Sequence, residues 1–193
     1  MGLAGLRPSL KPTTSWSTDW GPLHIPIMFN SLFLNSRGAT FALELVNRLC
    51  EEVPGVMAMK DDVGGELARK ICLRTHDSWV TSAGGQKQNH MNLHPYGVDG
   101  YLSTFIKFKP EIAWQYWNAI QANDLEAARG VIRDYDIPLF EYLLGLEGGF
   151  NAGIYGILEL RGLTTRYRRA PYHALTDLQM EKLTEFVRER KIL

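Results

Sequence analysis

The sequence predicts an α/β protein with a parallel sheet, followed by a helical region. From about residue 24, short apolar runs alternate four times with longer amphipathic stretches, and the connections between them are short. Repeated strand–helix units of this kind predict a parallel sheet, and glycine-rich strand ends favour a barrel over a doubly wound sheet. A complete barrel needs eight strands in about 250 residues. With four visible strands, the chain is expected to form about half of a barrel.

The first two units are predicted over residues 25–75. Ile25 to Phe29 is an apolar run of strand length, and Thr40 to Glu52 places apolar residues on one helical face. The second strand is predicted at 56–59 and the second helix at 65–75. Two strands separated by a helix of this length are expected to lie parallel in one sheet.

The third and fourth units follow over residues 79–122. A strand at 79–83 ends in Gly84-Gly85, and a short helix at 86–93 is terminated by Pro95. The fourth strand is predicted at 98–104. Pro110 suits the first turn of the next helix, which is expected to run to about residue 122.

No strand pattern continues beyond about residue 124, where three or four helices are expected instead. Asn123-Asp124 is a start signal for a helix that runs through Arg133, and Thr176-Asp177 is a start signal for a helix over 177–190. A further helix is predicted at 149–160. The chain therefore divides into an irregular, disordered lead at 1–22, a half barrel at 23–123 and a helical region at 124–193.

Composition excludes several classes of partner. The 193 residues carry 21 basic and 21 acidic side chains, and this zero net charge favours neither nucleic acid nor an anionic membrane. No apolar run approaches the roughly 20 residues that cross a bilayer, and the start of the sequence lacks the pattern of a signal peptide. Cys50 and Cys72 lie in amphipathic helical stretches and are expected to be thiols in a reducing cytoplasm.

Lys60 is the first candidate for chemistry. It ends the apolar run 56–59 and is followed by Asp61 and Asp62. The carboxyl ends of barrel strands form the floor of the active site, and partial desolvation there would make a neutral amine available to form a Schiff base with a carbonyl carbon. The competing interpretation is a strand cap that reaches solvent and pairs with Asp61 or Asp62.

Four blocks of sequence together resemble one enzyme family, the dihydrodipicolinate synthase and N-acetylneuraminate lyase family of class I lyases. The resemblance runs from about His24 to Leu193, and it covers the carboxyl-terminal half of the family's (β/α)8 barrel. The resemblance depends on the order and spacing of the blocks more than on any single block. The blocks are Val56-Met57-Ala58-Met59-Lys60-Asp61-Asp62, Ser82-Ala83-Gly84-Gly85, Gly97-Val98-Asp99-Gly100-Tyr101-Leu102-Ser103 and Asn123-Asp124-Leu125-Glu126-Ala127-Ala128-Arg129.

The resemblance implies a lyase, aldolase or dehydratase in which Lys60 condenses with the keto carbon of pyruvate or a related 2-oxo acid. The covalent Schiff base would serve in place of a cofactor, and no metal is implied. Gly84 and Leu102 match positions that line the family's pocket, and Arg37 resembles the arginine that binds the substrate carboxylate. Asn30 is a further candidate for contact with the substrate.

The sequence departs from the family's pattern in two ways. The position of the family's catalytic tyrosine, before asparagine at the end of the fifth strand, is Phe29, which has no hydroxyl to transfer protons. Asn30, a water molecule or the substrate itself would have to take that role. The family's Gly-Thr-Thr-Gly-type loop is also not found in residues 1–23. The site is therefore expected to be incomplete, and a second copy or a complementing half barrel is expected to cover the open sheet edges.

Two other functions stay open at this point. His90 and His94 stand four residues apart, as metal ligands on a helix can, and Asp61, Asp62 or Asp99 could complete a metal-dependent aldolase or isomerase. A polar helix face that ends at Pro95 explains the same histidines. The chain could also be an inactive remnant or a subunit that serves only in assembly.

Overall fold

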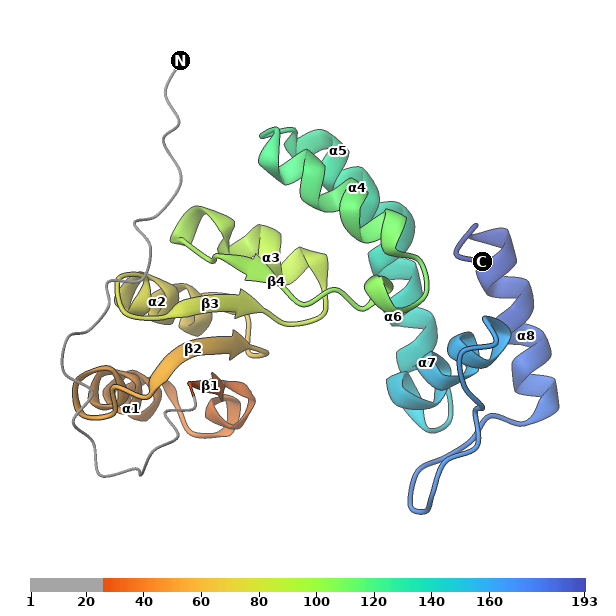
Figure 1. Ribbon diagram of the computed structural model, residues 1–193, viewed down its shortest axis with the longest axis horizontal. Coiled ribbons are helices and arrows are strands. Elements are labelled where there is room, and N and C mark those ends of the chain that lie inside the picture. Colours follow the sequence, from red (N-terminus) through yellow and green to blue (C-terminus); the bar gives the residue numbers. More distant parts are fainter. Residues whose placement is uncertain (1–25) are drawn as a thin grey trace.

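The computed structural model describes residues 26–193 (Figure 1). The irregular lead expected at 1–22 and the start of the first strand at Ile25 lie outside the described residues.

Four parallel strands form one sheet, as the alternating pattern predicts, and their order is β1-β2-β3-β4. Asn30 pairs with Lys60, and Lys60 pairs with Ser82, so these three residues lie side by side on one face. The arrows of β2, β3 and β4 point toward the part of the chain that holds α6 and α7 (Figure 1). The strands are β1 (Ile27–Asn30), β2 (Val56–Asp61), β3 (Val80–Ala83) and β4 (Gly100–Tyr101).

Three helices, α1 (Ala39–Glu52), α2 (Gly65–Thr75) and α3 (Lys87–Leu93), pack against one face of the sheet. Met59 of β2 is completely buried against this layer, together with Val46 of α1 and Ile71 of α2. The predicted helices at 40–52, 65–75 and 86–93 are confirmed to within one residue at either end. Their apolar stripes supply the core that fixes this face of the sheet.

The opposite face of the sheet has no helix layer within residues 26–193. Met28, Val80 and Leu102 project from it and are 52%, 43% and 44% exposed. Parallel sheets are normally covered on both faces. This open face of the sheet therefore exposes apolar side chains that a second layer of structure would normally cover.

The fourth strand is much shorter than the predicted strand at 98–104. Only Gly100 and Tyr101 pair with β3, and the chain then turns into a 3₁₀ helix, η3 (Phe105–Lys107). Phe105 is fully buried in the core of the helical region. No described strand pairs with the outer edge of β4, so little pairing favours a longer strand. Burial of Phe105 in the helical core instead directs the chain away from the sheet after Tyr101.

The region after β4 is helical, as expected. Asp124 accepts a hydrogen bond from the backbone of Ala127 and caps α5, and Thr176 forms a capping box with Gln179 at the start of α8. One core cluster extends from Phe105 to Ile192. The helices are α4 (Pro110–Gln121), α5 (Leu125–Val131), a π-helical turn η4 (Ile132–Asp136), α6 (Ile137–Leu144), α7 (Gly149–Leu160) and α8 (Asp177–Glu189).

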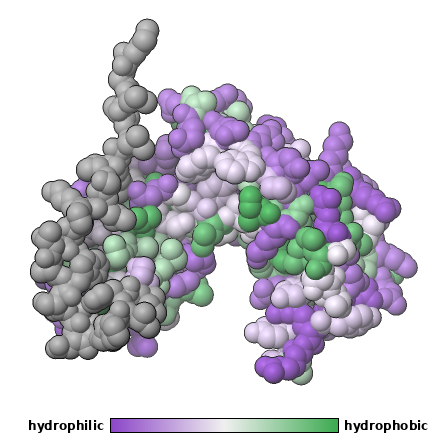
Figure 2. All heavy atoms as spheres, viewed as in Figure 1, coloured by the Kyte–Doolittle hydropathy of each residue, from purple (hydrophilic) through white to green (hydrophobic). Residues whose placement is uncertain are grey.

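The molecule is an arch that is hollowed between the strand-containing part and the last helices (Figure 2). Within residues 26–193, no helix is both long and apolar enough to cross a membrane. Both cysteines are free thiols; Cys72 is buried, and this burial raises the pKa of its thiol to about 12.

Candidate active site

The ends of the four strands are joined by backbone hydrogen bonds that continue beyond the regular pairing. This ladder holds the predicted site residues Asn30, Lys60, Gly84 and Leu102 along one edge of the sheet. Ser31 N donates to Lys60 O at 3.0 Å, Gly84 N to Asp61 O at 2.6 Å and Leu102 N to Ala83 O at 2.9 Å.

Lys60 projects from the open face and forms an ion pair with Asp62. Its ammonium contacts Oδ2 of Asp62, and the two side chains are 28% and 21% exposed. Asp61, the other partner that the sequence allowed, is fully buried on the helix side of β2. It accepts hydrogen bonds from Ser31 Oγ at 2.9 Å and from Gly64 N at 3.0 Å. Asp61 thus organises the loop, and Asp62 faces the lysine.

Asp62 is fixed through both its side chain and its backbone. Asn30 Nδ2 donates to its Oδ2 at 2.9 Å, and the backbone N–H of Asp62 donates to Ser31 Oγ at 3.0 Å. Gly84 approaches so closely that a Cβ there would collide with Oδ1 of Asp62 and would lie 2.9 Å from the carbonyl oxygen of Asp61. Gly84 is therefore needed for the close approach of the β3 end to this carboxylate.

Phe29 lies on the other face of the sheet from Lys60. It pairs with the buried Met59, and its ring packs 5.4 Å from the ring of Phe33 and 6.1 Å from that of Trp79. Because successive side chains on a strand point to opposite faces, Asn30 and not Phe29 stands beside Lys60. Phe29 therefore packs against the core on the helix side of the sheet.

The remaining candidates differ in their surroundings. Leu102 lines a cavity of about 470 Å³ beside β4, together with Trp114 and Trp117 of α4. Arg37 ends the 3₁₀ helix η1 (Leu32–Ser36), and its side chain is exposed. Its backbone N–H donates to Leu34 O at 3.1 Å.

The two histidines do not assemble a metal site with the strand-end aspartates. His90 is buried, and its Nδ1 lies 2.9 Å from the hydroxyl of Tyr116. Burial, with a smaller effect of His94, lowers the pKa of His90 to about 4. Across the described part of the chain, no group of three His, Cys, Asp or Glu side chains is placed to hold a metal ion.

Sequence reasoning missed two features near the site. Ser31 is fully buried and links Asp61 to the backbone of Asp62. Lys87, just after the Gly84-Gly85 turn, forms a completely buried ion pair with Asp136. The pair is 49 residues apart in sequence, so no local pattern could have indicated it.

A family model matches this chain over residues 27–190, and its description is the dihydrodipicolinate synthetase family. Among curated relatives, the probable 5-dehydro-4-deoxyglucarate dehydratase of Bradyrhizobium sp. (strain ORS 278) is 27% identical over 158 residues, which are 80% of this chain and 50% of the relative. The protein of the same name from Acinetobacter baumannii (strain AB307-0294) is 25% identical over 162 residues, 82% of this chain and 54% of the relative.

Solved structures share the fold. A putative dihydrodipicolinate synthetase from Pseudomonas aeruginosa aligns with a TM-score of 0.69 and 24% identity, covering 86% of this chain and 56% of that one. The N-acetylneuraminate lyase from Mycoplasma synoviae aligns with a TM-score of 0.66 and 19% identity, over 87% of this chain and 54% of that one. The present chain thus spans about half the length of the proteins it matches.

Proposed function

Because the chain belongs to the dihydrodipicolinate synthetase family, we propose that Lys60 is the Schiff-base nucleophile of a lyase that acts on pyruvate or a related 2-oxo acid. The observation that carries this proposal is the position of Lys60 at the carboxyl end of β2, on the open face of the sheet. Its neighbours there are Asn30, Asp62 and the Gly84 turn. An amine at a strand end is well placed to attack a carbonyl carbon.

The proposed chemistry needs no separate cofactor. Condensation of Lys60 with a keto group gives an iminium ion, which withdraws electrons from the adjacent carbon atoms. That withdrawal assists loss of water or cleavage of a carbon–carbon bond. We favour dehydration, because relatives from several bacteria are named 5-dehydro-4-deoxyglucarate dehydratase. The compound in this name, 5-dehydro-4-deoxyglucarate, carries a keto group beside a carboxylate, so it belongs to the proposed class of substrate.

Borohydride trapping tests this function directly. The purified chain is incubated with pyruvate and sodium borohydride, and the modified peptide is identified by mass spectrometry. We expect a reduced adduct on Lys60 that is absent from Lys60→Arg. Lys107, an exposed lysine beyond β4, serves as an internal control for unselective modification. No adduct at Lys60, with a circular-dichroism spectrum that shows a folded chain, would favour the assembly-only alternative.

A partner that covers the open face of the sheet would enclose the candidate site, whereas trapping at Lys60 does not depend on such a cover, because the lysine is already accessible there. Met28, Val80 and Leu102 form an apolar surface there, and β1 and β4 pair with no further strand within residues 26–193. An eight-stranded barrel would need four more strands. We propose that a complementing half barrel of the same family covers this face, because the chain aligns with only about half of each relative.

The mass of the protein in solution separates the possible partners. Light scattering after size-exclusion chromatography gives the number of copies, and Leu102→Glu places a charge in the proposed interface. Binding of a half barrel that Leu102→Glu abolishes supports the proposal. A stable dimer of this chain alone, dissociated by Leu102→Glu, would instead identify a second copy as the occupant. Thr40→Glu, on the exposed side of α1, is the matched control.

A further inference from the structure

The structure leaves one chemical requirement of the proposed reaction without an assigned residue. Forming a Schiff base from a lysine ammonium and a ketone releases one water molecule. The ketone supplies the oxygen of that water, and the lysine nitrogen supplies both hydrogen atoms. A group beside the amine must move them. Phe29 has no hydroxyl and packs on the helix side of the sheet, against Phe33 and Trp79.

We propose that Asp62 is a catalytic residue that carries these protons between Lys60 Nζ and the departing oxygen. This inference rests on the proposed function of Lys60. Its basis is the direct contact of the Asp62 carboxylate with the reacting nitrogen. General acid–base groups act through such direct contact, because a proton moves only over a hydrogen-bond distance.

The surroundings of Asp62 hold its carboxylate in place for this task. Asn30 donates to Oδ2, the oxygen that contacts Lys60, at 2.9 Å. The absence of a side chain on Gly84 leaves space for Oδ1, and Ser31 Oγ accepts the backbone N–H of Asp62. Asn30 thus binds the carboxylate from β1, Ser31 fixes the backbone of Asp62, and Gly84 leaves room for the carboxylate at the end of β3. Together they keep the carboxylate beside Lys60 Nζ.

The proton balance closes with these groups alone. Asp62 takes one proton from the Lys60 ammonium and gives it to the keto oxygen as the new nitrogen–carbon bond forms. It then takes a second proton from the nitrogen and gives it to the hydroxyl, and the carbon–oxygen bond breaks to release water. The nitrogen keeps one proton and its positive charge as the iminium ion. Asp62 ends as the carboxylate with which it began.

Two reactions of Lys60 separate this role from a structural one. Trapping of the pyruvate adduct by borohydride requires the proton transfers, whereas acetylation by an N-hydroxysuccinimide ester requires only a free amine. The rates of both are measured at Lys60 by peptide mass spectrometry in the wild type, Asp62→Asn and Asp134→Asn. Asp134 is an exposed aspartate that pairs with Arg133, so its variant is the matched control.

We expect Asp62→Asn to slow adduct formation by about 10²-fold or more, the scale of general acid–base catalysis. Acetylation should be equal or faster, because the amine is no longer held in an ion pair with a carboxylate. Asp134→Asn should change neither rate.

Equal trapping rates in Asp62→Asn and wild type would overturn the role of Asp62 and leave the function of Lys60 standing. A parallel loss of both reactions would also overturn it, because that result indicates a structural role. If the wild type forms no adduct while Lys60 is acetylated normally, the proposed function fails and the role of Asp62 fails with it.

Discussion

Lys87 and Asp136 form an ion pair whose side chains are both completely buried, with Nζ 3.1 Å from Oδ1. The other carboxylate oxygen accepts the backbone N–H of Lys87 at 2.8 Å, and the ammonium lies 4.0 Å from the ring centroid of Phe105. Burial lowers the pKa of Lys87 and raises that of Asp136. Lys87 begins α3 directly after the Gly84 turn, and Asp136 ends the π-helical turn η4, so the pair joins the site to the helical region.

Removal of one member of this pair should destabilise the protein strongly. Lys87→Met or Asp136→Asn leaves the other group buried without its partner, which costs about 3–5 kcal/mol. The double variant Lys87→Met/Asp136→Asn should be less destabilised than the sum of the two, because no uncompensated charge remains. Urea unfolding measures all three free energies. Additive effects would show that the two groups are not coupled.

His90 should make the protein less stable as the pH falls from 6.5 toward 4. Its pKa is about 4 in the folded chain, against 6.5 as the ordinary value, so in this window the unfolded state binds the additional proton. The free energy of unfolding should fall by about 3 kcal/mol in all, and this loss is complete near the lower pH. Stability is retained above pH 6.5, where both states are neutral.

The matched variant is His90→Asn, which keeps a nitrogen near the Tyr116 hydroxyl but does not titrate. The Tyr116 hydroxyl already donates to Lys87 O at 3.1 Å, so His90 Nδ1–H is the donor that the amide must replace. We expect a shallower loss of unfolding free energy between pH 6.5 and 4 in this variant. An unchanged slope would contradict the assignment.

Gly84→Ala should disturb the candidate site from the β3 side. The added Cβ would collide with Asp62 Oδ1 and approach the carbonyl oxygen of Asp61, so the expected cost is about 1–3 kcal/mol. Trapping at Lys60 should slow as well, because Asp62 is displaced. In Gly130→Ala the new methyl group meets open space in helix α5, and this variant should be slightly more stable. Equal unfolding free energies in the two variants would argue against the close approach.

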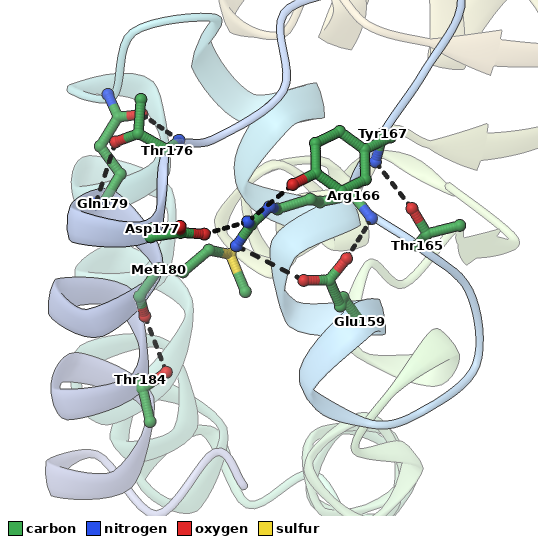
Figure 3. A network of polar contacts seen from close by, with 9 residues as sticks. All are labelled: Glu159, Thr165, Arg166, Tyr167, Thr176, Asp177, Gln179, Met180 and Thr184. Atoms are coloured by element: carbon green, nitrogen blue, oxygen red, sulfur yellow. Dashed lines mark hydrogen bonds and ion pairs between the residues drawn. The ribbon is translucent and has the colours of Figure 1, made fainter.

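Arg166 should control how firmly the segment between α7 and α8 is held. Its guanidinium contacts Glu159 of α7, the hydroxyl of Tyr167 and Asp177 at the start of α8 (Figure 3). Arg166→Ala should therefore speed proteolytic cleavage within residues 161–176 and amide exchange at the start of α8. Arg169→Ala, an exposed arginine in the same segment, is the control. Equal cleavage rates in the two variants would show that the contacts do not hold the segment.

Much of the fold follows from local patterns. The parallel sheet and the helices α1, α2, α4 and α8 agree with the predictions, because apolar periodicity and helix-start residues act over a few neighbouring positions. The strand predicted at 98–104 fails for a non-local reason. Burial of Phe105 in the helical core ends β4 after Tyr101.

The sequence by itself determined that a lysine stands at the carboxyl end of a buried strand, and that two aspartates follow it. Only the tertiary structure decided that Asp62 faces Lys60 while Asp61 is buried, since both are adjacent and chemically alike. It also placed Phe29 on the helix side and brought Lys87 to Asp136. These outcomes depend on which face of the sheet the helices cover and on contacts between distant segments, and a local sequence pattern encodes neither.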